Sequence, residues 1–448
     1  MVFRGKPSKA PCRRAKVVCH GYRDTQQLRV HDETKSVQHR VFLPRSLQQP
    51  IETQARDAFL AHYVAPVLRG WDFLAPVSVT TPSYLLSSLD AVSLAYLAHL
   101  QHSPSILGRA RSQYSTALRL MNKALLPSSG AASKHSMLTG TMLLDLFEKI
   151  THSGPSKVEF WRSHIDGSLA LIQALGLDYF RDYPSLRILS RLVTNCIISC
   201  VTSATAVPQQ LIEVRAHLTR QMNLEDPKWK HATIMIEYAA FREALQKSVW
   251  TIPKYIFVAQ DIDQRLLDLS QNMPKGWEPE VHVLDMSLEI PSRLLFYRDR
   301  HVTQMVNALR LVRILLNEFL LESYQKQDGI NSRLFEEPAI RAITSLIDDI
   351  CASIPQYVRC QCQFSTRPQQ HSPTQTLDCQ RLLFPLYVAG RSRWASLKQR
   401  AWIMQQLRHI HAHFGLHNSS VLVKLLESQM KIDPWNIYAM LGSYGFAA

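Results

Sequence analysis

The chain has 448 residues, of which 46% are hydrophobic and 19% are charged, and its net charge is +15. This composition excludes a wholly disordered protein and is sufficient to form a large hydrophobic core. The length suggests two or three domains or one large helical domain. The eight cysteines are too scattered for a disulfide scaffold, and the lack of an apolar run of about 20 residues or of a secretory signal predicts a soluble, intracellular protein with reduced thiols.

The positive charge is concentrated at the start of the chain. Residues 1–45 hold eleven Lys and Arg residues against three Asp and Glu residues, so one tenth of the chain carries +8 of the net charge. A localised excess of this kind is the electrostatic footprint expected for binding to a polyanion such as DNA. A basic arm that is merely solvated is the alternative that charge alone leaves open.

A short cysteine motif lies inside this basic segment. Two cysteines have six residues between them, several of which are basic: Cys12, Arg13, Arg14, Lys16 and Cys19. The stretch resembles the second and third cysteines and the DNA-facing basic helix of the fungal binuclear zinc cluster, in which six cysteines hold two zinc ions. Lys9 occupies the place of the first cysteine and no cysteine follows until Cys196, so the second half of the motif is missing.

The zinc-cluster resemblance is too incomplete to predict a metal site. A structural zinc ion requires four ligands, and the metal supplies the free energy that folds such a module. Cys12 and Cys19 are too few even with His20 as a third ligand, so we expect zinc only if the missing cysteines are restored. We interpret residues 1–22 as a zinc-cluster remnant that contacts DNA phosphates without reading bases. The residues expected at the phosphates are Lys6, Lys9, Arg13, Arg14 and Lys16.

The remainder of the chain is predicted to be an all-α body behind a linker. Residues 23–54 are polar, contain two prolines and read as the linker. Residues 55–430 carry apolar residues at helical spacing, without the sustained alternation typical of a sheet. Residues 431–448 are expected to form a C-terminal tail.

Helix boundaries follow from the apolar spacing and from Pro, Ser and Gly residues between the segments. The clearest helix has an apolar stripe from Val302 to Leu320, and another is expected to begin at Pro338 and to end before Pro355. Further helices are expected over residues 85–101, 104–126, 135–150, 157–176, 185–201, 231–251, 394–414 and 418–430.

A second motif lies in the helix expected over residues 157–176. Trp161, His164 and Gly167 stand three residues apart there, in a stretch that resembles the W-x-x-H-x-x-G-A-x-x-L helix of the fungal-specific transcription factor regulatory domain. Three further stretches are similar to other helices of that family: Ala110, Tyr114, Ala117 and Leu118; Leu144 to Glu148; and Asn307 to Arg310. Before the last of these, Val306 stands where the family usually has an aromatic residue. The resemblance covers roughly residues 55 to 430 and implies an all-helical regulatory domain.

The spacing of this motif has a structural interpretation. Trp161, His164 and Gly167 fall on nearby parts of one helical face, where a glycine would let a neighbouring helix approach closely. We expect His164 to be a hydrogen-bonded structural histidine, with a catalytic base as the alternative. The motif therefore predicts packing and no catalytic residue.

Two further clusters are candidates for metal binding. His409, His413 and His417 recur every four residues and would stack on one side of a helix, although Gly415 interrupts it. Cys360, Cys362, His371 and Cys379 offer four ligands with a spacing that is unusual for a structural zinc site. We expect an exposed histidine face and ordinary cysteines, and no metal at either cluster.

The family resemblance implies a transcriptional regulator in the nucleus. Regulators of this kind often control a fungal secondary-metabolite gene cluster, and the implied partners are other transcription regulators or a second copy, nonspecific DNA and a small effector, with no membrane. The alternative is a helical protein-binding or scaffolding protein that descends from such regulators and does not act at promoters. An enzyme is the least favoured class, because the sequence has no phosphate loop, dinucleotide fingerprint or nucleophile elbow.

Overall fold

The protein is described by a computed structural model that covers residues 14–16, 49–64, 71, 74, 78, 80–125, 134–151, 158–284, 290–326, 332–358 and 371–441. The chain divides into two compact units, Met1–Pro50 and Ile51–Ala448. Of the first unit the structure describes few residues, among them Arg14 to Lys16 with exposed side chains. The boundary between the units falls inside the expected linker.

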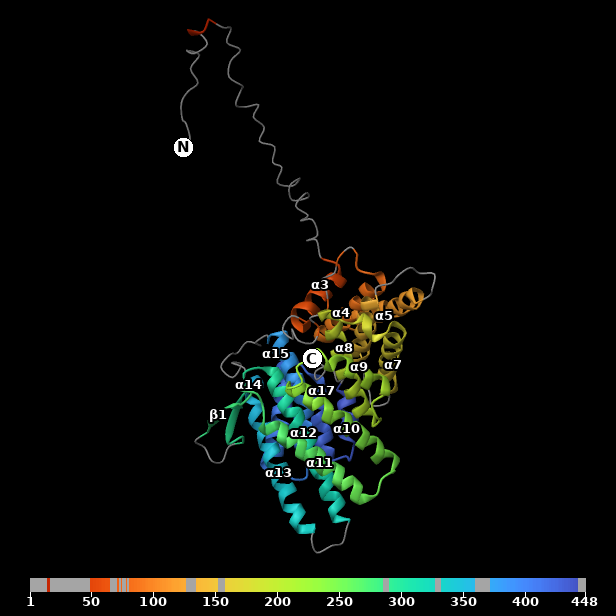
Figure 1. The fold of residues 1–448 in the computed structure, drawn as a ribbon. Coiled ribbons are helices and arrows are strands. Elements are labelled where there is room, and N and C mark those ends of the chain that lie inside the picture. Colours follow the sequence, from red (N-terminus) through yellow and green to blue (C-terminus); the bar gives the residue numbers. More distant parts are fainter. Residues whose placement is uncertain are drawn as a thin grey trace. The chain divides into compact units, whose positions relative to one another are not determined.

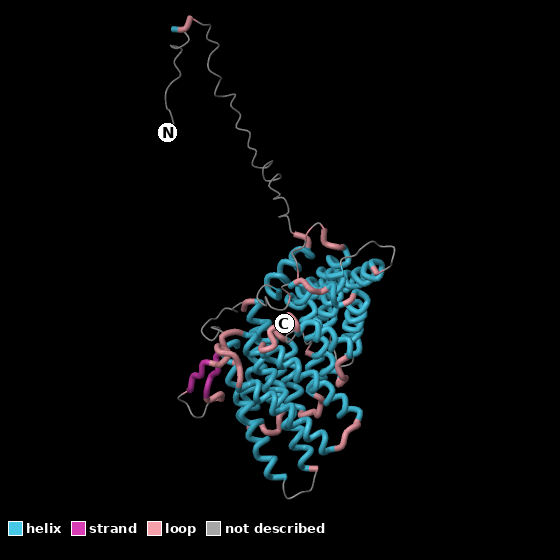
Figure 2. The backbone as a smooth tube through the Cα atoms, in the orientation of Figure 1, coloured by secondary structure: helices cyan, strands magenta, loops and turns pink. Residues whose placement is uncertain are grey.

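The second unit is built almost entirely from helices (Figures 1 and 2), which confirms the predicted all-α fold. Its first half contains α3 (Ile51–Phe59), the π-helical turn η1 (Leu60–Val64), α4 (Ser83–Gln101), α5 (Pro104–Ala124), α6 (Lys134–Thr151), α7 (Val158–Leu175), the 3-10 turn η3 (Leu177–Tyr179), α8 (Tyr183–Ser203) and α9 (Gln209–Thr219). Local chemistry sets these boundaries, as at α5, where Pro104 occupies the first turn and the Ser103 hydroxyl accepts a hydrogen bond from the Ile106 amide.

The second half of this unit continues with α10 (Pro227–Lys247), α11 (Ile252–Gln271), β1 (Glu280–Val283), β2 (Arg293–Phe296), α12 (Arg300–Gln325), α13 (Ser332–Ser353), α14 (Pro355–Val358), α15 (Pro373–Arg391), α16 (Leu397–Phe414), α17 (His417–Ser428) and α18 (Pro434–Met440). The Asp299 carboxylate caps α12 by accepting hydrogen bonds from the His301 and Val302 amides, both at 2.9 Å. Ser396 and Gln399 form a reciprocal capping box at the start of α16.

Several elements differ from the sequence-based expectations. α13 begins at Ser332, so Pro338 lies inside the helix and does not start it. The helices α9, α11 and α15 were not expected, and β1 pairs antiparallel with β2 in a short hairpin, with Glu280 opposite Phe296. The hairpin lies at one side of the unit beside α13 and α14 (Figure 1).

Part of the predicted C-terminal tail belongs to the helical body. Residues 431–448 were expected to be a tail, but α18 packs against α8 and α15, and its side chains Trp435, Ile437 and Tyr438 are buried. The expectation failed because a helix of seven residues is too short to show a clear apolar period. The body therefore extends beyond residue 430.

The helix α8 passes through the core of the unit. Among the described residues it is the one helix that is long and apolar enough to cross a membrane by length and composition, and 78% of its most apolar window is buried inside the unit. The expectation that no apolar segment reaches this length was therefore wrong, and the burial is that of a core helix. Cys196 and Cys200 are buried in it, as expected for core thiols.

Candidate functional site in a cavity between the helices

A cavity of about 300 Å³ lies between α8, α10, α12, α15 and α18. We call it the inter-helix cavity. Its lining residues come from these helices and from the segments that precede α10 and follow α11: Arg187, Ser190, Arg191, Val193, Thr194, Ile197, Ile198, Val201, Met222, Asn223, Asp226, Lys228, Trp229, His231, Ala232, Met235, Trp277, His301, Gln304, Met305, Ala308, Leu311, Val312, Phe384, Trp435 and Tyr438.

The helices α8, α10 and α12 run in the same direction past the cavity. Late in α10, the Arg242 Nε donates a hydrogen bond of 2.8 Å to the carbonyl of Val201 in the last turn of α8. Phe241 of α10 packs edge-on against Phe319 in the second half of α12, with ring centroids 5.3 Å apart. The first turns of α10 and α12 also meet, because Lys228 acts electrostatically on His301.

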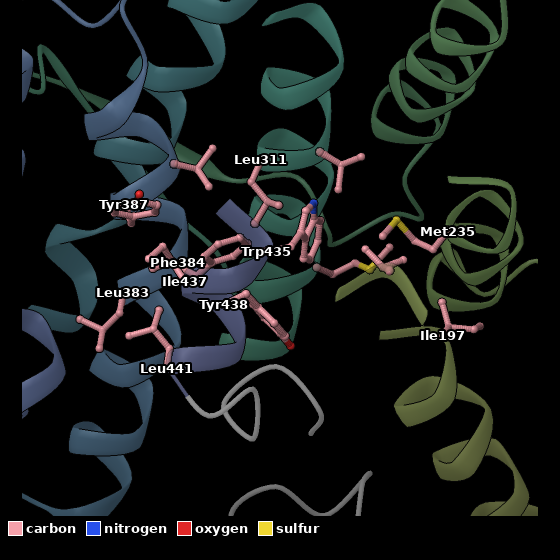
Figure 3. Packing of buried hydrophobic residues seen from close by; sticks show 14 of the residues in the cluster. Ile197, Met235, Leu311, Leu383, Phe384, Tyr387, Trp435, Ile437, Tyr438 and Leu441 are labelled. Atoms are coloured by element: carbon pink, nitrogen blue, oxygen red, sulfur yellow. The ribbon is translucent and has the colours of Figure 1, made fainter. Parts of the chain in front are cut away.

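This common direction gives the cavity a polar end and an apolar end. Polar residues from the first half of α8 and the first turns of α10 and α12 line one end: Arg187, Ser190, Arg191, Lys228, His231, His301 and Gln304. Apolar residues later along these helices or from α15 and α18 line the other end: Ile197, Val201, Met235, Leu311, Val312, Phe384 and Trp435. Apolar residues also lie beside the polar ones, among them Trp229, Ala232 and Met305. Figure 3 shows Trp435 reaching from α18 towards Leu311 and Met235.

Two histidines at the polar end have buried ring nitrogens that lack a hydrogen-bond partner among the described residues. These atoms are Nε2 of His231 and Nδ1 of His301. Burial lowers the pKa of His231 to about 4. Burial also lowers the pKa of His301, to about 3, with further lowering by the charges of Lys228, Arg381 and Arg300. Both imidazoles are therefore neutral near pH 7.

An aromatic cluster fixes the apolar end. The Trp435 Nε1 donates a hydrogen bond of 3.2 Å to the hydroxyl of Tyr238 in α10. Phe384 of α15 packs against both Trp435 and Tyr438, with ring centroids 5.4 and 5.0 Å apart. These contacts hold α18 against the rest of the unit, so its two large side chains form a wall of the cavity.

The helix motifs noted in the sequence meet in a separate, structural cluster. The Tyr114 ring stacks on Phe147 with centroids 4.4 Å apart, and its hydroxyl lies 3.1 Å from Nε2 of His164. Burial lowers the pKa of His164, and burial together with the nearby Glu148 raises the pKa of Tyr114. His164 thus has the hydrogen bond expected for a structural histidine.

One prediction about this motif was wrong. A side chain added at Gly167 would meet no atom within 4 Å, and the residue is exposed, so no neighbouring helix of the described residues approaches it closely. The spacing of the motif residues indicated that they share one face of the helix, but it did not indicate which part of that face packs against a neighbouring helix. Trp161 lies in α7, and its side chain is outside the described residues.

Other motif residues form buried polar contacts between helices. The Lys149 ammonium pairs with the Asp145 carboxylate at 2.7 Å, and the Asn195 amide of α8 donates to the same carboxylate at 3.0 Å. In α12, the Arg310 guanidinium donates to Asn307 at 2.9 Å and to the hydroxyl of Tyr297 at 2.7 Å. These groups hold elements together and lie away from the inter-helix cavity.

Comparison with known proteins gives a family match in the first half of the chain. Residues 26–232 match the fungal specific transcription factor domain. This confirms the resemblance that the sequence motifs indicated over that range. No curated protein and no solved structure matches the chain. The matched range of the fungal specific transcription factor domain includes α8 and the start of α10, whereas α12, α15 and α18 lie outside it.

His409, His413 and His417 do not form the stacked triad that their spacing in the sequence suggested. His409 and His413 are neighbours, with ring centroids 4.3 Å apart, and His409 Nε2 lies 3.1 Å from the carbonyl of Val358. Gly415 ends the helix with a φ of 68°, so His417 instead faces His411 at 6.1 Å. Across the part of the chain that the structure describes, no group of three or more His, Cys, Asp or Glu residues is placed to hold a metal ion.

The second candidate cluster is only partly described. Cys360 and Cys362 lie outside the described residues. His371 stacks on Phe414 with ring centroids 4.1 Å apart, and the thiol of the buried Cys379 donates to the carbonyl of Tyr357 at 3.7 Å.

The predicted DNA contacts fall in the first unit. Lys6, Lys9, Arg13 and the remnant cysteines Cys12 and Cys19 lie outside the described residues. Arg14 and Lys16 are described and exposed. The inter-helix cavity was not predicted, because no motif in the sequence marks residues that come from such distant segments.

Proposed function

We propose that the protein is a transcriptional regulator whose helical body is controlled by a small effector bound in the inter-helix cavity. The match to the fungal specific transcription factor domain supports the first part. The cavity supports the second, because about 300 Å³ lies at the lower end of the range for small-molecule sites, and the lining combines apolar walls with a few converging polar groups. The proposed regulator is not an enzyme and acts in the nucleus.

The proposed regulator does not read DNA by itself, because the zinc cluster is incomplete. It reaches its promoters through another transcription regulator or a second copy, and the genes it controls are those of a secondary-metabolite cluster. The basic residues of the remnant, Lys6, Lys9, Arg13, Arg14 and Lys16, add contacts to DNA phosphates.

Chromatin immunoprecipitation of the full chain tests this proposal. We expect signal concentrated at a limited set of promoters. Protein that is present in the cell but gives no promoter signal would refute regulation and favour a scaffold instead. Sequencing the 5′ region of the transcript is the accompanying control, because three further cysteines encoded after Gly21, together with a cysteine in place of Lys9, would restore a DNA-reading module.

DNA affinity in solution tests the role assigned to the remnant. We expect the purified full chain to bind duplexes of unrelated sequence equally, with an affinity that falls steeply as salt increases. A variant with Gln at all five basic remnant positions should lose most of this affinity. Tight binding to one sequence, resistant to salt, would contradict the proposal.

A further inference from the structure

We propose that the ligand of the inter-helix cavity is an organic anion with an aromatic body. Its acidic group, such as a carboxylate, lies among Lys228, His231 and His301, and its rings lie against α18. This inference rests on the proposed function, because it names the chemistry of the effector.

The first support is the charge of the lining. Arg187, Arg191 and Lys228 line the cavity, whereas Asp226 is the one acidic residue among the described residues that line it. Asp226 is exposed and caps α10 by accepting a hydrogen bond from the Lys228 amide at 2.9 Å. Positive charge in a concave site with low-dielectric walls creates a potential that favours an anion.

The second support is the pair of buried ring nitrogens. Nε2 of His231 and Nδ1 of His301 have no hydrogen-bond partner among the described residues, although buried polar atoms in native proteins nearly always have one. Both atoms belong to residues that line the same end of the cavity. An acidic group of a ligand can accept a hydrogen bond from either imidazole and also neutralise the nearby ammonium of Lys228.

The third support is the aromatic wall at the opposite end. Trp435, Tyr438 and Phe384 present their rings there, and Ile197 and Met235 lie across from them (Figure 3). Ala308 on α12 also lines the cavity, and its small side chain leaves space beside these rings. Flat aromatic rings of a ligand gain both apolar burial and ring packing at such a wall.

A matched pair of fluorescent probes tests the inference on the full chain. The anionic probe is 1-anilinonaphthalene-8-sulfonate, and the neutral probe is N-phenyl-1-naphthylamine, which has the same rings without the sulfonate. We expect the anionic probe to bind at least about tenfold more tightly, because a hydrogen bond to a charged group contributes at least that much affinity.

Variants locate the binding site. Lys228→Gln and His301→Phe should each weaken binding of the anionic probe about tenfold and leave the neutral probe unaffected. The controls Lys398→Gln and His413→Phe change exposed residues of α16 outside the cavity and should change neither affinity. Ala308→Trp should abolish binding of both probes by filling the cavity, and Ala232→Leu replaces it if thermal unfolding shows that the Trp variant is not folded.

The outcomes separate this inference from the proposed function. Equal affinity for the two probes, both lost on filling the cavity, would overturn the anion inference and leave the effector cavity in place. Failure of the unmodified chain to bind either probe, or binding that survives Ala308→Trp, would overturn both the inference and the effector role of the cavity. Promoter occupancy is measured separately and is independent of either result.

Discussion

The buried ion pair within α6, which faces Asn195 of α8, provides a quantitative test of the structure. Asp145 and Lys149 have side chains that are 6% and 2% exposed, and their charged atoms are 2.7 Å apart. Asn195 donates a further hydrogen bond to the same carboxylate oxygen. The perturbation is Asp145→Leu, which removes the carboxylate and keeps the ammonium buried.

The expected cost follows from the distance and the burial. At an effective dielectric constant of about 20, two charges 2.7 Å apart attract each other by roughly 6 kcal/mol, which is an upper bound for this pair. Removing one member of a buried pair typically costs about 3–5 kcal/mol, because the other charge keeps its desolvation cost. The double variant Asp145→Leu/Lys149→Met has no such charge and should cost about 1–2 kcal/mol, mainly from the amide of Asn195.

Urea unfolding followed by far-ultraviolet circular dichroism measures these free energies. The control is Glu225→Gln, which breaks the pair between Glu225 and Lys230, whose side chains are 80% and 44% exposed. An exposed pair of this kind should contribute less than about 1 kcal/mol. A loss below about 1 kcal/mol for Asp145→Leu, or a double variant less stable than the single one, would refute the burial described for this pair.

The remaining predictions concern pH, two glycines and one tyrosine. The pKa values of His231 and His301 lie below the 6.5 of an unperturbed histidine, so unfolding takes up protons and stability falls as the pH falls below 6.5. By about pH 5 the free energy of unfolding should have fallen by about 1–2 kcal/mol per histidine. Replacing each histidine by Phe should reduce this pH dependence in urea titrations, and an unchanged pH dependence would contradict the lowered pKa values. Gly167→Ala should raise the free energy of unfolding by about 0.5–1 kcal/mol, since open space surrounds the new methyl group. Gly390→Ala should not raise the free energy of unfolding, because its methyl group would lie 3.1 Å from neighbouring side chains of α16 and α17. Equal stabilisation by the two alanine substitutions would count against the close packing at Gly390. Tyr114→Phe removes the hydroxyl beside the buried histidine of α7 and should lower the melting temperature through a loss of about 1 kcal/mol, whereas an unchanged melting temperature would argue against that contact.

Helices with one apolar face could be predicted from the sequence, whereas α15 and α11 were missed. The stripe from Val302 to Leu320 marked α12, which runs from Arg300 to Gln325. In α15, residues 381–390 are all buried, so no polar face interrupts the apolar one and no period is visible. α11 is different, because its buried residues follow helical spacing and could have been recognised: Tyr255, Ala259, Ile262, Leu266 and Leu269.

The family motif could be read from the sequence, whereas the inter-helix cavity could not. Tyr114 and His164 lie in stretches with recognisable spacing, and they meet in the structure. The cavity joins residues from Arg187 to Tyr438, and spacing within a helix carries no information about which distant helix packs against it. His231 and His301 look like ordinary helix residues until burial and neighbouring charges are known.

The position of α18 in the chain has a consequence for protein synthesis. Its residues Trp435 and Tyr438 are translated long after α8, α10 and α12, which form the other walls of the cavity. A nascent chain therefore exposes the apolar surface of those walls until the ribosome has released α18. A frameshift or stop codon between α17 and α18 would produce a polypeptide with most of its helices but an open cavity, and chaperones and proteases act on such exposed surfaces.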